Sequence, residues 1–218
     1  MRLFIVLLLS SLFSFSAYSE TSAWELQKEE KAINLKIYTR QIEGSNLKEF
    51  KAEMLVKAQL TTIAALLLDG QSAPKWIHLC EKFEVVEQID ELTAIVYFIN
   101  GAPWPVSDRD AVVMTAISQD PESLVLKAEM NVVNDLLPEN SDYVRIPHMK
   151  GFWLFEPKVA DQILVTYQVH ANPGGSLPDW LANSVVVDTP YYTMRNMVEM
   201  LKLKKYQQID VLSIKNVQ

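Results

Sequence analysis

Residues 104–110 read WPVSDRD, residues 172–183 read NPGGSLPDWLAN, and an apolar-faced helical pattern follows the second stretch. The first stretch lies within a long run of strand-like segments, and the second closes that run on a Gly-Gly turn. A single helix with one apolar face must bury that face against the largest surface available, which here is the sheet. The two stretches therefore predict a sheet that holds one helix, with a space between them.

The strand-like segments extend on both sides of residues 104–110. Alternation at Ile33, Leu35 and Ile37, and again along residues 50–58, predicts a hairpin with one buried and one solvated face. Residues 24–31 before it are expected to be a helical or irregular lead-in. Later strands are expected at residues 83–88, 93–100, 110–118, 123–133, 142–148, 151–156 and 162–170. The separations are too short for parallel crossovers, so these strands are expected to pair antiparallel.

Helices are expected at three places in the sequence. Residues 60–68 break the alternation and end before Gly70, and residues 74–79 form a second short turn of helix. Near the C-terminus, Thr189 and Pro190 are expected to be the N-cap and the first position of an amphipathic helix. Residues 178–187 are expected to be helical as well, joined to that helix across a kink or break at Thr189-Pro190.

The N-terminal residues have the composition of a secretory signal peptide. Arg2 precedes an almost unbroken aliphatic run at residues 3–9, and small and aromatic residues follow as far as Ser19. Cleavage is expected near Ser19-Glu20, which makes the mature protein an exported one, periplasmic or secreted; a retained N-terminal anchor is the alternative. The expected organisation is a signal peptide at 1–19, one domain at 20–210 and a C-terminal tail at 211–218.

Charge and composition limit the partners. The 218 residues contain 20 Lys and Arg against 27 Asp and Glu, a formal charge of −7, so nucleic acid and anionic surfaces are poor partners for the whole molecule. A cluster at Lys202, Lys204 and Lys205 either makes a transient membrane contact or is the solvated end of a helix. Cys80 is the single cysteine, so no internal disulfide forms. A monomer is favoured, although the sequence does not fix the oligomeric state.

Motifs for catalysis or metal binding are missing from the sequence. The three histidines, His78, His148 and His170, lie on different expected elements, and none has a metal-binding partner at helical spacing. There is no G-x-S-x-G motif, and Gly174-Gly175 is interpreted as a turn because no phosphate-binding pattern accompanies it. We therefore expect no metal, no cofactor and no catalytic residues.

Several short motifs occur in a fixed order along the chain. They are Trp24 with the strand Ile37-Tyr38-Thr39-Arg40, Asp69 before Trp76, Ile95-Val96-Tyr97, Pro105, Arg109-Asp110, Val144-Arg145, Gly151-Phe152-Trp153, and the PGG and LPDWLAN stretches of residues 173–183. In this order they resemble the START family, the lipid-transfer domains related to the steroidogenic acute regulatory protein. The resemblance covers almost the whole chain after the signal peptide.

The resemblance implies an α+β helix-grip fold, in which a curved antiparallel sheet wraps around a long C-terminal helix and encloses a hydrophobic tunnel. It also implies binding, and possible transfer, of one lipid, fatty acid or sterol-like molecule, without enzymatic activity. Several animal members carry an extra buried arginine six residues after the Arg-Asp pair, where this chain has Thr115. This difference puts the identity of the head group, and sterol in particular, in doubt.

Ligand contacts are expected from residues of the loop, the sheet and the last helix: Trp104, Arg109, Trp153, Tyr167, Met194, Met197, Val198 and Leu201. Methionines repack readily around variable apolar ligands, but ordinary core filling explains these side chains equally well. Arg109-Asp110 is interpreted first as a salt bridge or loop clamp at the start of a strand. Residues 101–108 are expected to form the mouth of the tunnel.

Two other functions are compatible with the same fold. One is a helix-grip enzyme of the cyclase or dehydratase type, which would need polar residues with shifted pKa values inside the cavity. The other is a protein-interaction module whose cavity has collapsed. The polarity of the cavity, and whether it exists, distinguish these functions from lipid binding.

Overall fold

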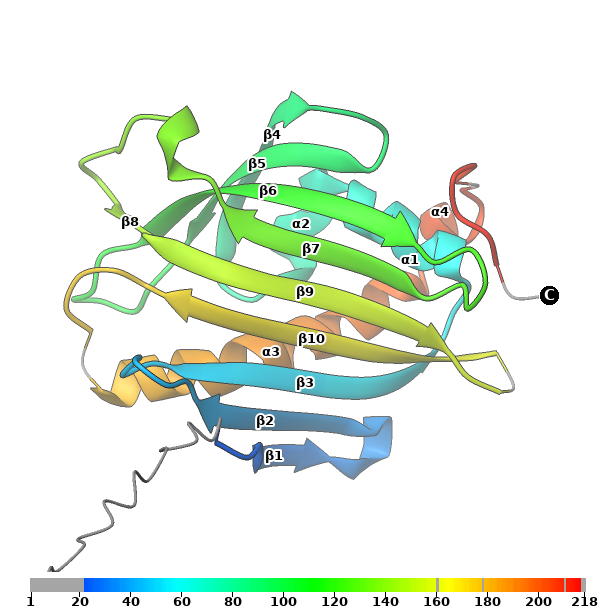
Figure 1. Ribbon diagram of the computed structural model, residues 1–218, viewed down its shortest axis with the longest axis horizontal. Helices are drawn as coiled ribbons and strands as arrows, with labels where there is room; N and C mark the ends of the chain where they lie inside the picture. The colour runs from blue at the N-terminus through cyan, green and yellow to red at the C-terminus, as the bar shows by residue number, and fades with distance from the viewer. Residues whose placement is uncertain (1–21, 160, 178, 210, 217–218) are drawn as a thin grey trace, which may run out of the picture.

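A computed structural model describes residues 22–159, 161–177, 179–209 and 211–216 of the chain, and the predicted signal peptide lies outside the described residues. An open ten-stranded sheet curves around one long helix (Figure 1). The fold is the predicted α+β helix-grip fold, with a sheet that does not close into a barrel.

The sheet is antiparallel except for one short contact. Its order is β1-β2-β3-β10-β9-β7-β6-β5-β4, and β8 pairs with β6. The strands are β1 (Glu25–Glu30), β2 (Leu35–Gln41), β3 (Lys48–Lys57), β4 (Cys80–Gln88), β5 (Thr93–Asn100), β6 (Arg109–Gln119), β7 (Leu126–Val132), β8 (Val144–Arg145), β9 (His148–Pro157) and β10 (Gln162–Asn172). Within the described residues, the two ends of the order, β1 and β4, pair with no further strand.

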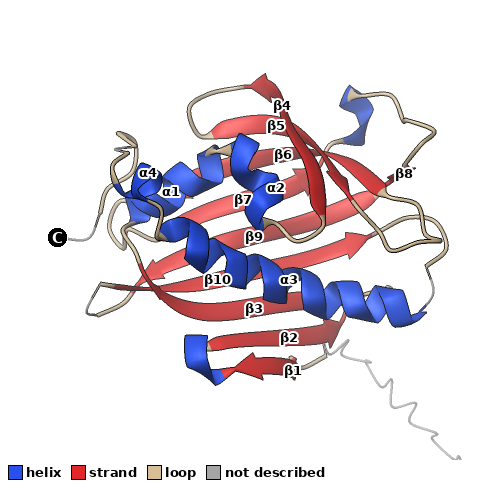
Figure 2. Cartoon of the chain, turned by 180° about the vertical axis from the view of Figure 1, so that it is seen from behind, coloured by secondary structure: helices blue, strands red, loops and turns tan. Residues whose placement is uncertain are grey.

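The described residues form four α-helices, and these lie on one side of the sheet (Figure 2). They are α1 (Leu60–Leu68), α2 (Ala73–Trp76), α3 (Asp179–Leu201) and α4 (Lys204–Gln207), with 3-10 turns at Lys31–Ile33, Gly70–Ser72 and Asn134–Leu136. The longest helix, α3, packs across β2 and β3. Within the described residues, none of the helices combines the length and the apolar character needed to cross a membrane.

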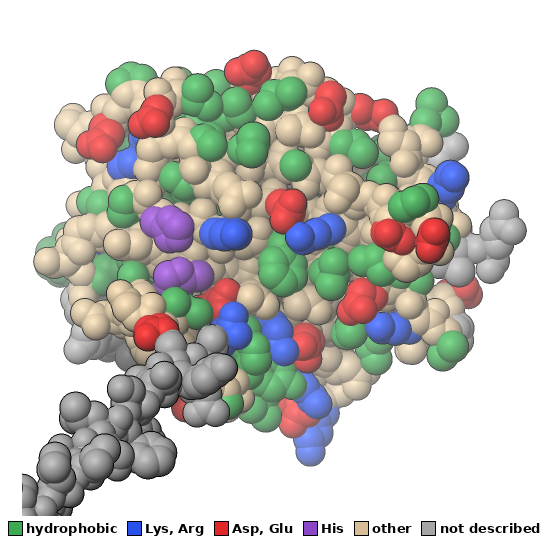
Figure 3. Space-filling view, viewed as in Figure 1, with side chains coloured by type: hydrophobic (Ala, Val, Ile, Leu, Met, Phe, Trp, Pro, Cys, Tyr) green, Lys and Arg blue, Asp and Glu red, His purple; other side chains and the backbone are tan. Residues whose placement is uncertain are grey.

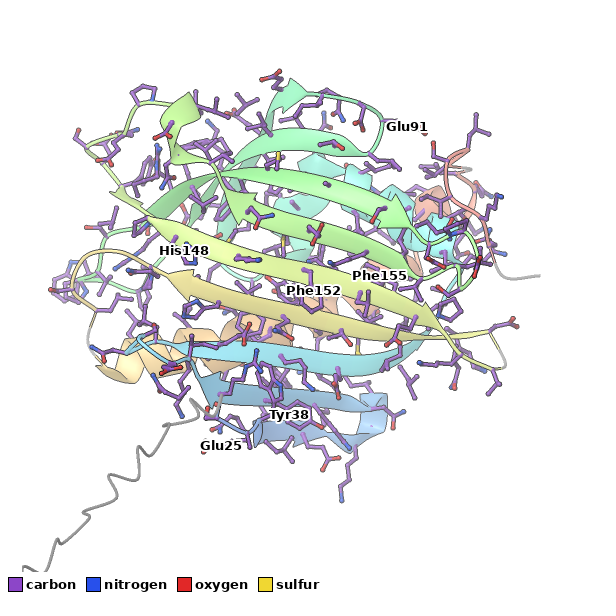
Figure 4. All side chains as sticks on the ribbon, viewed as in Figure 1. Glu25, Tyr38, Glu91, His148, Phe152 and Phe155 are labelled. Carbon is purple, nitrogen blue, oxygen red and sulfur yellow. The ribbon has the colours of Figure 1, made fainter. Side chains whose placement is uncertain are left out.

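The main core lies between the sheet and these helices. Alternating residues of β2 and β3, such as Leu35, Ile37 and Met54, are fully buried there, as the period-two pattern predicts. On β9, Phe155 points into the core, and Phe152 lies on the other face under the Lys127 ammonium (Figure 4). Burial of one aliphatic or aromatic side chain contributes about 1.5–3 kcal/mol, so this layer supplies most of the stability.

The residues assigned to a C-terminal tail contribute to the same core. Val211 and Ile214 are buried, and the Asn216 side chain exchanges hydrogen bonds with Thr61 at the start of α1. After α4, the chain therefore folds back onto α1.

The outer face of the sheet is polar, and charges of both signs are interleaved on it (Figure 3). Neighbouring pairs such as Lys51–Glu53 and Lys127–Glu129 lie 2.7 Å apart on this face. The two edge strands are irregular as well as charged. The register shifts once between β1 and β2 and twice between β4 and β5.

Three details of the fold differ from the sequence expectation. Residues 24–31 are mostly the edge strand β1, because pairing with β2 overrides a sequence that lacks alternation. The strand expected at 142–148 shrinks to the two residues of β8, which pair parallel with β6. Thr189 and Pro190 are not a helix start, since α3 runs through them as one helix with Pro190 inside.

Candidate ligand cavity

A cavity of about 170 Å³ lies between the first half of α3 and one end of the sheet. The β2–β3 turn, the β5–β6 loop and the loop after β10 meet at this end, on the left in Figure 1. Gly174 and Gly175 in the last of these loops have φ of +68° and +60°, which side chains disfavour. A Cβ on Gly174 would also lie 2.8 Å from the Arg145 carbonyl, so glycine lets this loop pack closely beside β8.

Apolar side chains make up most of the cavity lining. They come from all the elements around it: Leu47, Phe50, Leu79, Ala102, Pro103, Ile146, Met149, Val169, Ala171, Pro173, Leu177, Leu181, Val185 and Val186. The polar lining residues are Lys48, His78, Asn100, Arg109, Tyr167 and Thr189. No carboxylate occurs among the described residues that line the cavity.

A second, larger hollow of about 820 Å³ lies at the β4 edge and opens widely to solvent. Residues 68–71 form one side of it, and the strand residues Phe83, Val85 and Tyr97 contribute to the other. An open hollow does not shield an apolar molecule from water, so the smaller cavity beneath α3 is the candidate site.

Arg109 begins β6 at the end of the β5–β6 loop and is 7% exposed. Its Nε donates to the Pro173 carbonyl at 3.4 Å, and its Nη1 donates to the Ser107 carbonyl. These two contacts connect the β5–β6 loop to the loop after β10. The loop-clamp interpretation of Arg109 therefore agrees with its contacts.

The neighbouring Asp110 forms an ion pair, and its partner is Arg145 of β8 rather than Arg109. The Asp110 carboxylate is fully buried and accepts 2.9 Å hydrogen bonds from Nε and Nη2 of Arg145. The Tyr97 hydroxyl donates to the same carboxylate at 3.0 Å, and burial together with this bond raises the pKa of Tyr97 to about 12. This network lies beside the cavity and accounts for the short parallel β6–β8 contact.

Two further polar residues of the cavity lining, Tyr167 and His78, pack against aromatic side chains. Tyr167 stacks on Trp153 with ring centroids 3.8 Å apart, and burial raises the pKa of its hydroxyl. His78 lies 4.7 Å from the Tyr192 ring; burial lowers the pKa of His78, and the Asp188 charge opposes part of that shift. Both groups are therefore neutral at pH 7 and suited to an apolar environment.

A model of the START domain matches residues 11–206. The chain belongs to the START domain family. The crystal structure of a STAR-related lipid transfer protein from Xanthomonas axonopodis has 36% sequence identity to it and a TM-score of 0.75, covering 84% of this chain and 100% of that one. An uncharacterized Pseudomonas aeruginosa protein is 32% identical, over 88% of this chain and 94% of the relative.

Mammalian START proteins are more distant relatives. The ceramide transfer protein of Mus musculus is 29% identical over 71% of this chain, and the match spans 28% of its own length. The phosphatidylcholine transfer protein of Rattus norvegicus is 24% identical over 73% of this chain and 75% of its own length.

The cavity of this START domain contains two of the eight predicted ligand-contact residues, Arg109 and Tyr167. Trp104 is 91% exposed at the tip of the β5–β6 loop, next to Pro103 of the rim. Trp153 lies behind Tyr167. The helix residues pack into the main core and do not line the cavity: Met194, Met197, Val198 and Leu201. The four helix residues are not cavity residues because the cavity lies beneath the first half of α3.

Sequence reasoning missed the helix residues that do line the cavity. Leu181, Val185 and Thr189 follow one another at four-residue spacing, which places them on one face of α3. The expected break at Thr189-Pro190 hid this pattern, because it divided the apolar face into two short pieces. Residues 101–103 of the predicted mouth do line the cavity.

Proposed function

We propose that this START domain binds one hydrophobic molecule in the cavity beneath α3, acts as a lipid carrier rather than an enzyme, and works after export from the cytoplasm. The observation that carries the proposal is the mostly apolar lining of the cavity. Burial of an acyl chain contributes about 0.8 kcal/mol per CH₂, so such a lining gives useful affinity without strong polar contacts. The names of the Xanthomonas, mouse and rat relatives, all transfer proteins for lipids, support the same conclusion.

Two features favour a carrier over an enzyme. The part of the lining that the structure describes has no carboxylate, so a carboxylate acid–base pair is missing from it. No group of three His, Cys, Asp or Glu side chains in the described residues is arranged to hold a metal ion. We therefore expect a bound lipid to leave the protein chemically unchanged.

The direct test is native mass spectrometry of protein purified from its own cells, followed by organic extraction of whatever is bound. A stoichiometric lipid, recovered unchanged, is the expected result. The same intact mass also tests export, since a chain that begins near Glu20 supports cleavage of residues 1–19. An apo protein that takes up nothing from total envelope lipid would argue against the carrier function.

A cavity-filling variant tests the location of the ligand. Val186→Trp places a large side chain in the lining and should reduce lipid uptake at least tenfold without unfolding the protein. Val159→Trp is the matched control, because Val159 is exposed on the β9–β10 hairpin at the other end of the sheet. Equal uptake by both variants would place the ligand elsewhere.

A transient membrane contact is part of the proposal, and Trp104 is the residue that favours it. An exposed tryptophan beside the cavity rim is suited to the membrane interface, where its ring is amphipathic. Trp104→Ala should slow lipid extraction from vesicles severalfold and leave the equilibrium affinity for a soluble ligand unchanged. Leu212→Ala, which removes another exposed apolar side chain, should change neither.

A further inference from the structure

Arg109 brings a positive charge to a mostly apolar cavity; burial lowers the pKa of its guanidinium, and the Asp108 charge opposes only part of that shift. Its guanidinium is almost fully buried, and its two hydrogen bonds go to uncharged backbone carbonyls. No carboxylate of the described residues forms an ion pair with it within 4.0 Å. Asp110 already forms an ion pair with Arg145. The Asp108 carboxylate accepts a hydrogen bond from the Ala102 N–H. A buried charge without an ion-pair partner is costly, so an acidic group inside the cavity would stabilise the Arg109 guanidinium.

Part of the guanidinium remains available for a ligand. Arginine has five N–H donors, and the bonds to Ser107 and Pro173 engage Nη1 and Nε. Nη2 makes no hydrogen bond to any side chain or backbone group that the structure describes. Because Arg109 belongs to the cavity lining, an oxygen atom inside the cavity is the acceptor within reach. An acidic group would satisfy the donor and the charge together, in a charge-assisted bond.

Asn100 lies directly beside Arg109. The two residues are cross-strand partners in the β5–β6 register, and both line the cavity. The Asn100 Oδ1 atom is buried and has no hydrogen-bond partner. A guanidinium with an open donor and an amide with an open acceptor thus meet at one end of an otherwise apolar space, which is the arrangement expected for the polar end of an amphiphile.

We propose that Arg109 binds the acidic group of an anionic lipid, a carboxylate or a phosphate, and that the open Oδ1 acceptor of Asn100 takes a hydrogen bond from a hydroxyl donor of the head group where one is present. This rests on the proposed function of the cavity and names the class of its ligand. The acyl chain extends along the apolar lining toward Tyr167. A neutral lipid of the same length leaves the Arg109 charge uncompensated, so it binds more weakly.

The first experiment changes the ligand and leaves the protein intact. The dissociation constants of palmitate and 1-hexadecanol are compared by displacement of an apolar fluorescent probe, and lysophosphatidic acid is compared with its monoacylglycerol. We expect the acidic member of at least one pair to bind roughly tenfold tighter, as a charge-assisted bond predicts. The pair that shows the preference identifies the head group as carboxylate or phosphate.

The second experiment changes the protein. Arg109→Met should remove most of the acid preference and leave binding of the neutral member nearly unchanged. Asn100→Asp places a carboxylate opposite the guanidinium and should weaken acid binding while keeping the Arg109 loop contacts. Lys127→Met removes a cation of the outer face of the sheet, one that lies 2.7 Å from Glu129 and outside the cavity lining, and should keep the preference.

The outcomes separate this proposal from the proposed function. Wild-type protein that binds palmitate and hexadecanol equally, and the phosphate pair equally, overturns the anionic ligand and leaves the carrier function standing. Wild-type protein that binds none of the four overturns the carrier function itself. Retention of the preference in folded Arg109→Met and in Asn100→Asp would exclude Arg109 as the binding group. If Arg109→Met does not fold, the acid preference of the wild-type protein and its loss in Asn100→Asp decide whether Arg109 binds the acidic group.

Discussion

Asp110 and Arg145 form a buried ion pair in a region where neither charge can be solvated. Asp110 is fully buried and the Arg145 side chain is 6% exposed, so each depends on the other for a counter-charge. Asp110→Asn removes the negative charge and leaves the Arg145 charge buried without a counter-charge. We expect this change to lower the free energy of unfolding by about 3–5 kcal/mol. Urea denaturation measured by circular dichroism checks this value.

A double-mutant cycle provides the control for this pair. Asp110→Leu combined with Arg145→Leu removes both charges, so it should cost clearly less than the sum of the two single changes. A double variant that loses the full sum would show that the two residues stabilise the fold independently.

Cys80 illustrates how burial controls the chemistry of a single group. Burial raises the pKa of its thiol to about 11, and a backbone hydrogen bond at Lys82 opposes only part of that shift. Because the thiolate is the reactive form, Cys80 should react with iodoacetamide at pH 8 far more slowly than in urea-unfolded protein. Labelling followed by mass spectrometry measures both rates, and equal rates would contradict the buried placement.

The role of Arg109-Asp110 was predictable in kind but not in detail. The sequence indicates an ion pair or a clamp at the start of β6, and the structure contains both, divided between the two residues. Arg145, the partner of Asp110, is 35 residues away in the sequence. A pairing at that separation depends on how β8 meets β6, which local patterns do not encode.

Pro190 divides α3 into two parts with different support. Proline has no N–H, so the Val186 carbonyl lacks its helical hydrogen-bond donor. The second part is held by Met194 and Met197, which are fully buried, and the first part covers the cavity. We expect amides before Pro190 to exchange with deuterium faster than amides at residues 191–200, in hydrogen-exchange mass spectrometry.

A variant shows whether the proline is the cause. Pro190→Ala restores the missing donor and should slow exchange in residues 184–189, with little change in the second half of the helix. Uniform protection along wild-type α3 would contradict the division. Slower lipid release from the same variant would connect this mobility to ligand exchange.

Elements with strong local periodicity were predictable, and elements defined by their neighbours were not. Alternation located β2 and β3, and the Gly70 stop located the end of α1. The edge strand β1 lacks alternation because both of its faces carry polar side chains. The uninterrupted α3 escaped prediction because tertiary packing tolerates a proline that normally ends a helix.

At the scale of the molecule, Asp69 connects the C-terminal region to the end of α1. Its carboxylate accepts hydrogen bonds from Ser72, Lys205 and Tyr206. Burial alone would raise the pKa of Asp69, but these bonds outweigh it and lower the pKa to about 2. The unfolded chain therefore takes up the proton first as the pH falls.

This shift predicts the response to acid. The stabilisation from Asp69 is fully present above about pH 4 and is lost as the pH falls toward 2, because the folded-state pKa is the lower one. Asp69→Asn should lower the free energy of unfolding by roughly 1–2 kcal/mol at pH 7 and flatten its dependence between pH 4 and 2. Thermal melts at several pH values measure both. An unchanged slope in the variant would assign the acid sensitivity to other groups.

The cavity is a property of the whole molecule, which explains why its residues were hard to predict. It requires the ends of β5, β6 and β10 to meet the first half of α3, and these segments are separated by long stretches of sequence. The general idea of a space under the helix followed from the fold. Its position, and hence the identity of its lining, followed from the path of α3 through Pro190.

The irregular, charged edges of the sheet affect how the protein behaves at high protein concentration. An open sheet presents unpaired N–H and C=O groups that invite a strand from another molecule. Here each edge strand carries three glutamates and one lysine, so β1 and β4 repel a second copy as well as bending away from it. We expect the protein to resist strand-to-strand aggregation and to stay dispersed even when its apolar cargo is absent.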